Sequence, residues 1–290
     1  MGEVNALLVF CEGAHDIAFV QQVLKVCLGF TRTQWKFSEH PAPFNQLFST
    51  SVKNYAAQDL SLDMARKFFL PDSVWQKDQD MILLFNSGGS TQVAKVKELL
   101  GKFLTLFKQC QVFPGQATAV VRQASYLFLY DADDVGAAAW FKKIKQDFAV
   151  IDDEPSWTFG EWDVLPNNPF GAVAGDKAAY IWGASAHQGT LEDVLLPMFE
   201  VDRQQLMADA GAFVDSAFQW DVDGRGKKDP IAEMGKRKKA IITCAGQRKK
   251  PGSPMSAILD QAKLITDSTF ANNAAVALFA DFMKKFMAFT

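Results

Sequence analysis

Cysteine and histidine are both scarce in this sequence. The four cysteines are scattered, with no Cys-x-x-Cys pair, and the three histidines have no zinc-binding spacing relative to them. Neither a disulfide framework nor a structural zinc site is therefore indicated. We expect a reduced, cytoplasmic protein.

Long apolar runs are also absent. No stretch reaches the roughly 18 uninterrupted apolar residues that a membrane-spanning helix needs. The chain begins Met1-Gly2-Glu3 and has no basic segment before its first short apolar run, as a secretory leader would have. We therefore expect neither secretion nor membrane insertion.

No Gly-x-Gly-x-x-Gly follows any predicted strand, which argues against a dinucleotide-binding protein.

What the sequence does contain is a large apolar fraction. Hydrophobic residues make up 49% of the 290 residues and charged residues 22%, a balance typical of a packed globular protein. With 25 phenylalanines, the core should be rich in that residue. The length suits one large domain or two modest ones, and we favour one main domain with an appendage.

Charge is unevenly distributed along the chain. The net charge of −3 does not indicate a protein that coats nucleic acid by bulk electrostatics. Residues 225–250, however, hold ten basic and two acidic side chains, so this segment carries +8 and the rest of the chain −11. Glycines in and around it suggest a mobile segment.

Short apolar runs alternate with amphipathic segments. Amphipathic helices are predicted over 16–30, from Val93 through Phe103, and over 137–148. Such an alternation predicts an α/β fold, with a mostly parallel, Rossmann-like sheet flanked by helices. The predicted strands are 6–11, 81–89, 126–134 and 177–185.

Two segments interrupt this alternation, residues 31–79 and 150–176, and both are interpreted as insertions. We therefore predict an α/β domain over 1–199 and a mainly helical C-terminal extension over 200–290. In the extension, helices are predicted over 203–218 and 255–287, with one strand over 239–245 (KAIITCA).

Acidic residues follow two of the predicted strands. Glu12 ends the first strand, and Asp131 and Asp133 lie at the end of the third. Because the carboxyl ends of parallel strands meet at one edge, these side chains should share a crevice. Carboxylate oxygens are the hard ligands that Mg²⁺ prefers. An alternative stays open, since acidic residues between a strand and a helix also cap the helix, and Asp16 could do only that.

The order of these motifs resembles the TOPRIM domain family. Glu12, Gly13 and Asp16 form an EGxxD motif after the first strand, and an SGG turn follows the second. Asp131-x-Asp133 follows the third strand, and Leu191-Glu192-Asp193 comes after the fourth. The resemblance covers roughly residues 5–199 without the insertions. It lies nearest to overcoming-lysogenization-defect nucleases or to stand-alone TOPRIM proteins.

This resemblance implies a metal-dependent site for phosphodiester chemistry. Asp131 and Asp133 would ligate Mg²⁺, or Mn²⁺ in its place, and Glu12 would be a general acid/base or a further ligand. Asp16 and Glu192 would serve a second metal. Nuclease relatives usually carry an ATPase domain, and no Gly-x-x-x-x-Gly-Lys-Ser/Thr loop is present. Any ATP-driven step would need a separate partner.

The basic segment is the candidate nucleic-acid contact, since lysine and arginine side chains can follow a phosphate backbone. A solvated charged loop is the alternative interpretation. The residues concerned are Lys236, Arg237, Lys238, Lys239, Arg248, Lys249 and Lys250.

We therefore expect a Mg²⁺-dependent enzyme on nucleic-acid phosphodiesters, in particular a nuclease. A second hypothesis is a non-catalytic module of the same fold that binds nucleic acid or protein in a metal-dependent way. A third is an enzyme acting on small phosphorylated substrates, which would have no use for the basic segment.

Overall fold

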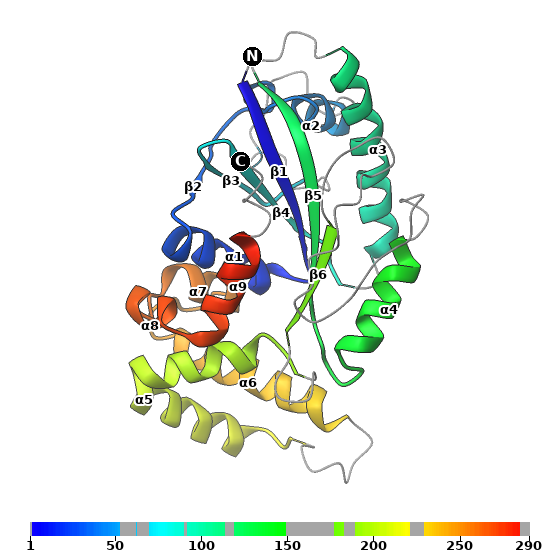
Figure 1. The fold of residues 1–290 in the computed structure, drawn as a ribbon. Helices are drawn as coiled ribbons and strands as arrows, with labels where there is room; N and C mark the ends of the chain where they lie inside the picture. Colours follow the sequence, from blue (N-terminus) through cyan, green and yellow to red (C-terminus); the bar gives the residue numbers. More distant parts are fainter. Residues whose placement is uncertain are drawn as a thin grey trace.

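The protein is built on one six-stranded sheet with helices on both faces (Figure 1), as a computed structural model shows. The strand order is β2-β3-β4-β1-β5-β6; β4, β1, β5 and β6 are parallel, and β3 and β2 join the edge in antiparallel pairing. The strands are β1 (Gly2–Cys11), β2 (Thr31–Arg32), β3 (Ser73–Lys77), β4 (Asp80–Asn86), β5 (Ala119–Asp131) and β6 (Lys177–Trp182). The structure describes residues 2–52, 62, 70–89, 92–113, 119–148, 177–182, 189–220 and 229–284.

Strand β1 lies in the middle of the sheet, and its side chains alternate between two cores. Leu7 and Val9 belong to one core, and Leu8 and Phe10 to the other. The alternation follows from the pleat, in which successive side chains point to opposite faces. Because helices cover both faces, the strand is apolar without interruption.

The first core lies between the sheet and α1 together with the C-terminal helices α5 to α9. The second lies between the sheet and α2, α3 and α4 on the opposite face, and it holds most of the stacked phenylalanines. The helices are α1 (Ala14–Gln22, continued by a π-helical turn Val23–Cys27), α2 (Phe44–Val52), α3 (Val93–Val112), α4 (Ala137–Phe148), α5 (Glu192–Ala217), α6 (Pro230–Gly246), α7 (Met255–Gln261), α8 (Asp267–Ala271) and α9 (Ala274–Lys284).

The predicted α/β class and mostly parallel sheet are confirmed. Each of the four predicted strands corresponds to a strand of the sheet, and the predicted helix 137–148 is α4. The segment 31–79, interpreted as an insertion, supplies β2 and β3 to the sheet edge. The second predicted insertion, 150–176, lies outside the described residues.

Two predictions in the C-terminal part are wrong. Residues 239–245 are not a strand but the last two turns of α6, a helix that Asp229 caps by accepting hydrogen bonds from the backbone nitrogens of Ile231 and Ala232. The single helix predicted over 255–287 is instead the three helices α7, α8 and α9. Thr266 caps α8 through its side chain and so separates it from α7.

Within the part of the chain that the structure describes, no helix combines the length and the apolar character needed to cross a membrane.

Candidate functional site

Glu12 and Asp131 lie side by side at the carboxyl edge of the sheet. Glu12 follows β1 directly, and Asp131 is the last residue of β5, the neighbouring parallel strand. The backbone nitrogen of Asp131 donates to Glu12 Oε2 at 3.2 Å, and that of Glu12 donates to the Leu129 carbonyl at 3.1 Å. The strand pairing therefore brings these two predicted residues together, as the sequence indicated.

Two helix N-termini bring further carboxylates to this edge. Asp16 lies in the first turn of α1 and Glu192 is the first residue of α5, and both are fully buried. His15 Nε2 lies 3.7 Å from Asp16 Oδ2 and 3.8 Å from Glu192 Oε1. The backbone nitrogen of Leu191 donates to Asp131 Oδ1 at 2.7 Å, which ties the start of α5 to β5.

Asp16 has the predicted capping role as well. The backbone nitrogen of Gly13 donates to its Oδ2 at 2.9 Å, whereas Oδ1 has no hydrogen-bond partner among the described residues. One oxygen therefore closes the first turn of α1, and the other remains available to a ligand. The capping interpretation and the functional one are thus compatible at this residue.

Asp133 lies on the loop after β5. Its backbone adopts the left-handed conformation, with φ of 49°, and exchanges two hydrogen bonds with Gly189, at 2.8 and 3.0 Å. The loop is held against the segment that leads into α5. Asp133 is half-buried, and burial raises the pKa of its carboxyl.

The pKa values of Asp16, Asp131 and Glu12 are raised at this edge. Burial, reinforced by the charge of Glu12, raises the pKa of Asp16 to about 8. Burial and the charges of Asp16 and Glu192 raise the pKa of Asp131 well above its ordinary value. Burial also raises the pKa of Glu12. These shifts follow from placing several acids together away from water, so a positive charge bound here would be stabilised.

Lys239 of α6 provides one such charge. Its Nζ lies 3.7 Å from Glu192 Oε1, and although burial opposes it, the charges of Glu192 and Asp131 raise the pKa of this lysine. Helix α6 packs along α5 beyond the carboxyl ends of the strands (Figure 1). The preceding lysine, Lys238, pairs with Asp193 in the first turn of α5. Two residues predicted to contact nucleic acid are therefore held at the acidic edge.

The other predicted nucleic-acid residues divide into two sets. Lys236 pairs with Glu233 at 2.9 Å, and Arg237 binds both carboxylate oxygens of Asp215, at 2.6 and 2.7 Å. Beyond the end of α6, the side chains at 248–250 form no ion pair within the described part of the chain. Of these, Arg248 and Lys249 are exposed and Lys250 is half-buried. Only this second set presents unneutralised positive charge.

The glycine turn after β4 closes one side of the acidic edge. Gly88 and Gly89 have φ of 68° and 76°, a conformation that glycine adopts without strain. The Gly89 nitrogen donates to the Glu12 carbonyl at 3.0 Å, and a Cβ at Gly89 would lie 3.6 Å from Glu12 Oε1. The turn that the sequence predicted is confirmed, and it keeps the backbone close to Glu12.

The donor set of this edge has the chemistry of a hard-metal site. Asp16 Oδ1 and both carboxylate oxygens of Glu192 are buried without a hydrogen-bond partner in the described part of the chain. Oxygen ligands of this kind suit Mg²⁺ or Mn²⁺. As the side chains stand, however, the described residues contain no group of three or more acids, histidines or cysteines arranged to hold a metal ion. Binding by several of these carboxylates would require them to move closer together.

Sequence reasoning assigned Lys239 to nucleic acid and did not place it at the acidic edge. A lysine within a basic segment gives no signal of which acid it will meet, because that contact depends on how α6 packs against α5.

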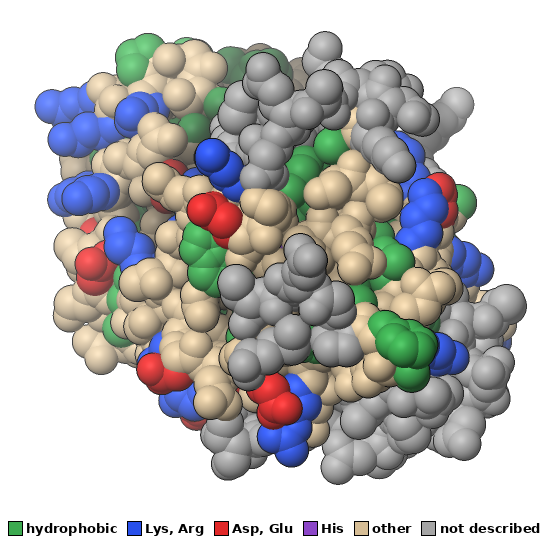
Figure 2. Space-filling model, turned by 90° about the horizontal axis from the view of Figure 1, so that it is seen from above, with side chains coloured by type: hydrophobic (Ala, Val, Ile, Leu, Met, Phe, Trp, Pro, Cys, Tyr) green, Lys and Arg blue, Asp and Glu red, His purple; other side chains and the backbone are tan. Residues whose placement is uncertain are grey.

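The opposite end of the molecule, at the amino ends of the strands, has acidic and basic side chains interspersed with uncharged surface (Figure 2).

The fold and this edge together define an α/β protein with a buried acidic cluster at the carboxyl ends of its parallel strands. No family model matches the chain, and no curated protein matches it. A solved structure that does match is that of a hypothetical protein from Pyrococcus horikoshii OT3, 15% identical. The match covers 98% of this chain and 96% of that one, with a TM-score of 0.47. A likeness this distant carries no argument about function.

Proposed function

We propose that this protein is a Mg²⁺-dependent phosphodiesterase acting on nucleic acid, a nuclease with a TOPRIM-like site. The observation that carries the proposal is the convergence of Glu12, Asp16, Asp131 and Glu192 from two strands and two helices, with buried carboxylate oxygens that lack hydrogen-bond partners. A buried acidic cluster of this kind is unfavourable by itself and becomes favourable when a cation binds.

The side chains divide the chemistry among them. Asp131 and Asp133, with Asp16 and Glu192, would hold Mg²⁺ or Mn²⁺, which when bound can activate water and stabilise the leaving oxygen. Glu12 Oε2 accepts from the Asp131 nitrogen, which leaves Oε1 to take or give a proton. Burial raises the pKa of Glu12 above its usual value, which is the direction that a general acid/base requires. Lys239 places a positive charge where a substrate phosphate would be drawn.

The substrate proposed is nucleic acid because a second positive surface lies at residues 248–250, after α6. Arg248, Lys249 and Lys250 have no acidic partner in the described ranges, so they can contact phosphates outside the acidic edge. A small phosphorylated substrate at the acidic edge would have no use for these residues. Binding through these residues should weaken as salt concentration rises.

The test is cleavage of plasmid, linear duplex, single-stranded DNA and RNA with Mg²⁺ or Mn²⁺. Asp131→Asn should lower the rate by more than about 100-fold, since even indirect changes around a metal cost about 10- to 100-fold. The substitution keeps an oxygen that can accept from the Leu191 nitrogen, so the fold should persist. Asp209→Asn, on the exposed surface of α5, is the matched control and should leave cleavage unchanged.

Binding of the same substrates is measured in parallel. Changing Arg248, Lys249 and Lys250 together to alanine should weaken binding and make its salt dependence shallower. Metal-dependent binding without cleavage in any substrate would replace the nuclease by the non-catalytic module. Cleavage that Asp131→Asn leaves intact would contradict the proposed site.

A further inference from the structure

A pocket of about 760 Å³ lies between the α/β part of the chain and helix α7. Its walls come from α1, the turn after β4, the start of α3, and Ser256 to Gln261 of α7. Pockets that bind small molecules or parts of larger ligands are roughly 300 to 1,000 Å³, so this one is large enough for a ligand group. The acidic edge described above does not account for it.

The pocket shares structural elements with the acidic edge. Ala14 and Ile17, which line it, lie on either side of His15 and Asp16 in α1. Ser87, also in its wall, is hydrogen-bonded to the Cys11 carbonyl through its backbone nitrogen and its hydroxyl, at 2.8 and 2.7 Å. Cys11 directly precedes Glu12. A strand passing over Glu12 could therefore place a neighbouring nucleotide in the pocket.

Four side-chain amides line the pocket, together with two basic and two acidic side chains, Arg32, Lys95, Asp72 and Asp260. Asn86 Oδ1 accepts from the Gly88 nitrogen, and Gln21 donates to the Ser73 hydroxyl, both at 3.0 Å. The side chains of Gln92 and Gln261 make no hydrogen bond within the described part of the chain, so both a donor and an acceptor are available on each. Amides of this kind match the paired donors and acceptors on the edges of nucleobases.

The remaining lining suits the other parts of a nucleotide. Ile17 and Pro71 provide apolar wall against which a base can lie. Lys95, in the first turn of α3, is exposed and has no ion pair with the described residues, so it can contact a phosphate. The pocket therefore combines an apolar wall, two amides without hydrogen bonds to the described residues, and Lys95, while Arg32 donates to the Asp72 carbonyl and Asp260 lies on α7.

We infer that this pocket binds one nucleotide of the substrate strand, with its base near Gln92 and Gln261 and its phosphate near Lys95. The inference rests on the proposed function for the substrate class, since a free nucleotide offers the pocket the same base and also carries a phosphate. It also gives α7 a part in substrate binding, which residues 1–199 alone could not supply.

The test measures binding to the full chain by calorimetry in EDTA, so that metal plays no part. The probes are deoxyadenosine 5′-monophosphate, deoxyadenosine, inorganic phosphate and a five-nucleotide DNA strand. Ala257→Phe, which fills the pocket from α7, should lower the affinity for the monophosphate and for the strand by at least tenfold. Ala208→Phe, at an exposed position of α5, is the matched control and should change neither. Lys95→Gln should lower the affinity for the monophosphate but leave the affinity for deoxyadenosine unchanged.

Gln261→Leu, at an exposed position, provides a second test that does not depend on Ala257→Phe folding normally. This variant should lower the affinity for deoxyadenosine. Equal affinities in Ala257→Phe and Ala208→Phe, or binding that phosphate alone reproduces, would overturn the inference. If only the free monophosphate responds to Ala257→Phe, the strand assignment is wrong. If the wild type cleaves none of the substrates but these binding effects are observed, the nuclease proposal is wrong and the nucleotide pocket stands.

Discussion

At the scale of single residues, the main feature is that Asp16 and Glu192 are buried among other acids. Two unit charges about 4 Å apart repel by roughly 1 kcal/mol in water and about 4 kcal/mol at an effective dielectric of 20. Burial therefore favours the protonated acid, and Asp16 shows this with a pKa of about 8. A bound cation would reverse the preference. The stability of the metal-free protein should thus depend on pH in a characteristic direction.

Stability without metal should fall as pH rises from about 4 to 8. Asp16 releases its proton near pH 3.9 when unfolded but near 8 when folded, so in this interval the folded state binds more protons. Its contribution is fully present below the unfolded pKa and lost as pH rises through the folded one. Glu12 and Asp131 shift in the same direction, whereas burial lowers the pKa of His15 and acts oppositely. Thermal midpoints in EDTA between pH 5 and 8.5 measure the sum.

The contribution of Asp16 is isolated by comparison with Asp16→Asn. The amide keeps an acceptor for the Gly13 nitrogen and cannot ionise, so the variant should gain stability relative to wild type as pH rises. Glu12, Glu192 and Lys239 surround the carboxyl in both proteins, and the difference between the two curves removes most of their effect. Parallel curves would show that Asp16 is not protonated in the folded protein. Added Mg²⁺ should stabilise wild type most at the higher pH values.

How much of the site was predictable also depends on the residue. Glu12 and Asp131 were predictable because strand ends are visible in the sequence and parallel strands end at one edge. Lys239 was named only as a nucleic-acid contact, since its position beside Glu192 depends on the packing of α6 on α5. The pairing of Lys238 with Asp193 was missed for the same reason.

At the scale of elements, α6 and α7 pack closely at a glycine, Gly246. A Cβ at Gly246, the last residue of α6, would lie 2.4 to 2.6 Å from three atoms of Ile258 in α7. Ile258 is almost completely buried, so it has little room to move. The absence of a side chain at Gly246 therefore sets how closely the two helices approach.

Gly246→Ala should destabilise the protein by about 1 to 3 kcal/mol, the usual effect of overpacking. Gly101→Ala in α3 is the matched control, because a Cβ there would meet no atom within 4 Å. That change should stabilise by about 0.5 to 1 kcal/mol, since alanine is the better helix former. Urea unfolding of both variants measures the expected decrease and increase in the free energy of unfolding.

The steric cause is tested by repeating Gly246→Ala in an Ile258→Ala background. If the clash with Ile258 is responsible, the added alanine should then have little effect, because the side chain that it would meet has been shortened. The same loss in both backgrounds would contradict this cause and place the effect in the backbone of α6.

The misprediction at 239–245 has a physical reason at this scale too. Ile241 and Ile242 are both buried, so the apolar run satisfies the pattern of a buried strand equally well. The residues before the run favour a helix, because Asp229 caps and Pro230 begins a helix that continues through it. Short apolar runs do not distinguish the two structures, and here the N-terminal signal was the informative one.

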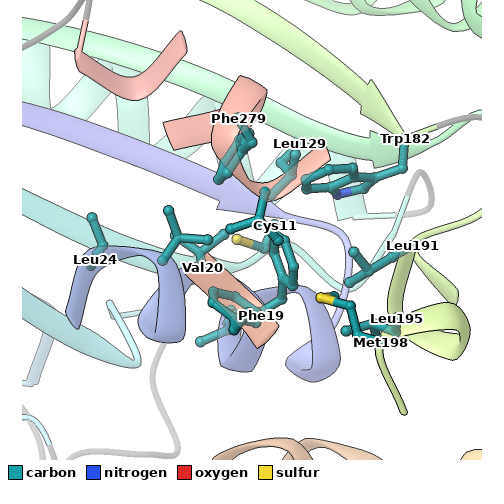
Figure 3. Close-up of a cluster of buried hydrophobic side chains, with 14 of the residues drawn as sticks. Cys11, Phe19, Val20, Leu24, Leu129, Trp182, Leu191, Leu195, Met198 and Phe279 are labelled. Carbon is teal, nitrogen blue, oxygen red and sulfur yellow. The ribbon is translucent and has the colours of Figure 1, made fainter. Parts of the chain in front are cut away.

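At the scale of the whole molecule, the C-terminal helices complete the first core. Figure 3 shows Phe279 of α9, Leu129 of β5 and Trp182 of β6 in the upper part of this cluster, with Cys11 of β1 and Phe19 of α1 below them. The ring of Phe279 lies 5.0 Å from that of Trp182 and 4.8 Å from that of Tyr180, measured between centroids. Without α9, this sheet face would expose aromatic side chains of β6. We therefore expect the sheet and residues 200–290 to fold together.

Phe279→Ala should destabilise the protein by about 3 to 5 kcal/mol, because it removes a fully buried ring from a packed core. The loss should appear in a single unfolding transition that fluorescence and circular dichroism report at the same denaturant concentration. Leu278→Ala, at a neighbouring position of the same helix that is 55% exposed, is the control and should change stability little. If the two probes separated into two transitions, with only the helical signal shifted by Phe279→Ala, the C-terminal helices would be an independent unit. Coincident transitions would instead make the positions of α6 and α7, and therefore Lys239 at the acidic edge, depend on the same cooperative core as the strands that carry Glu12 and Asp131.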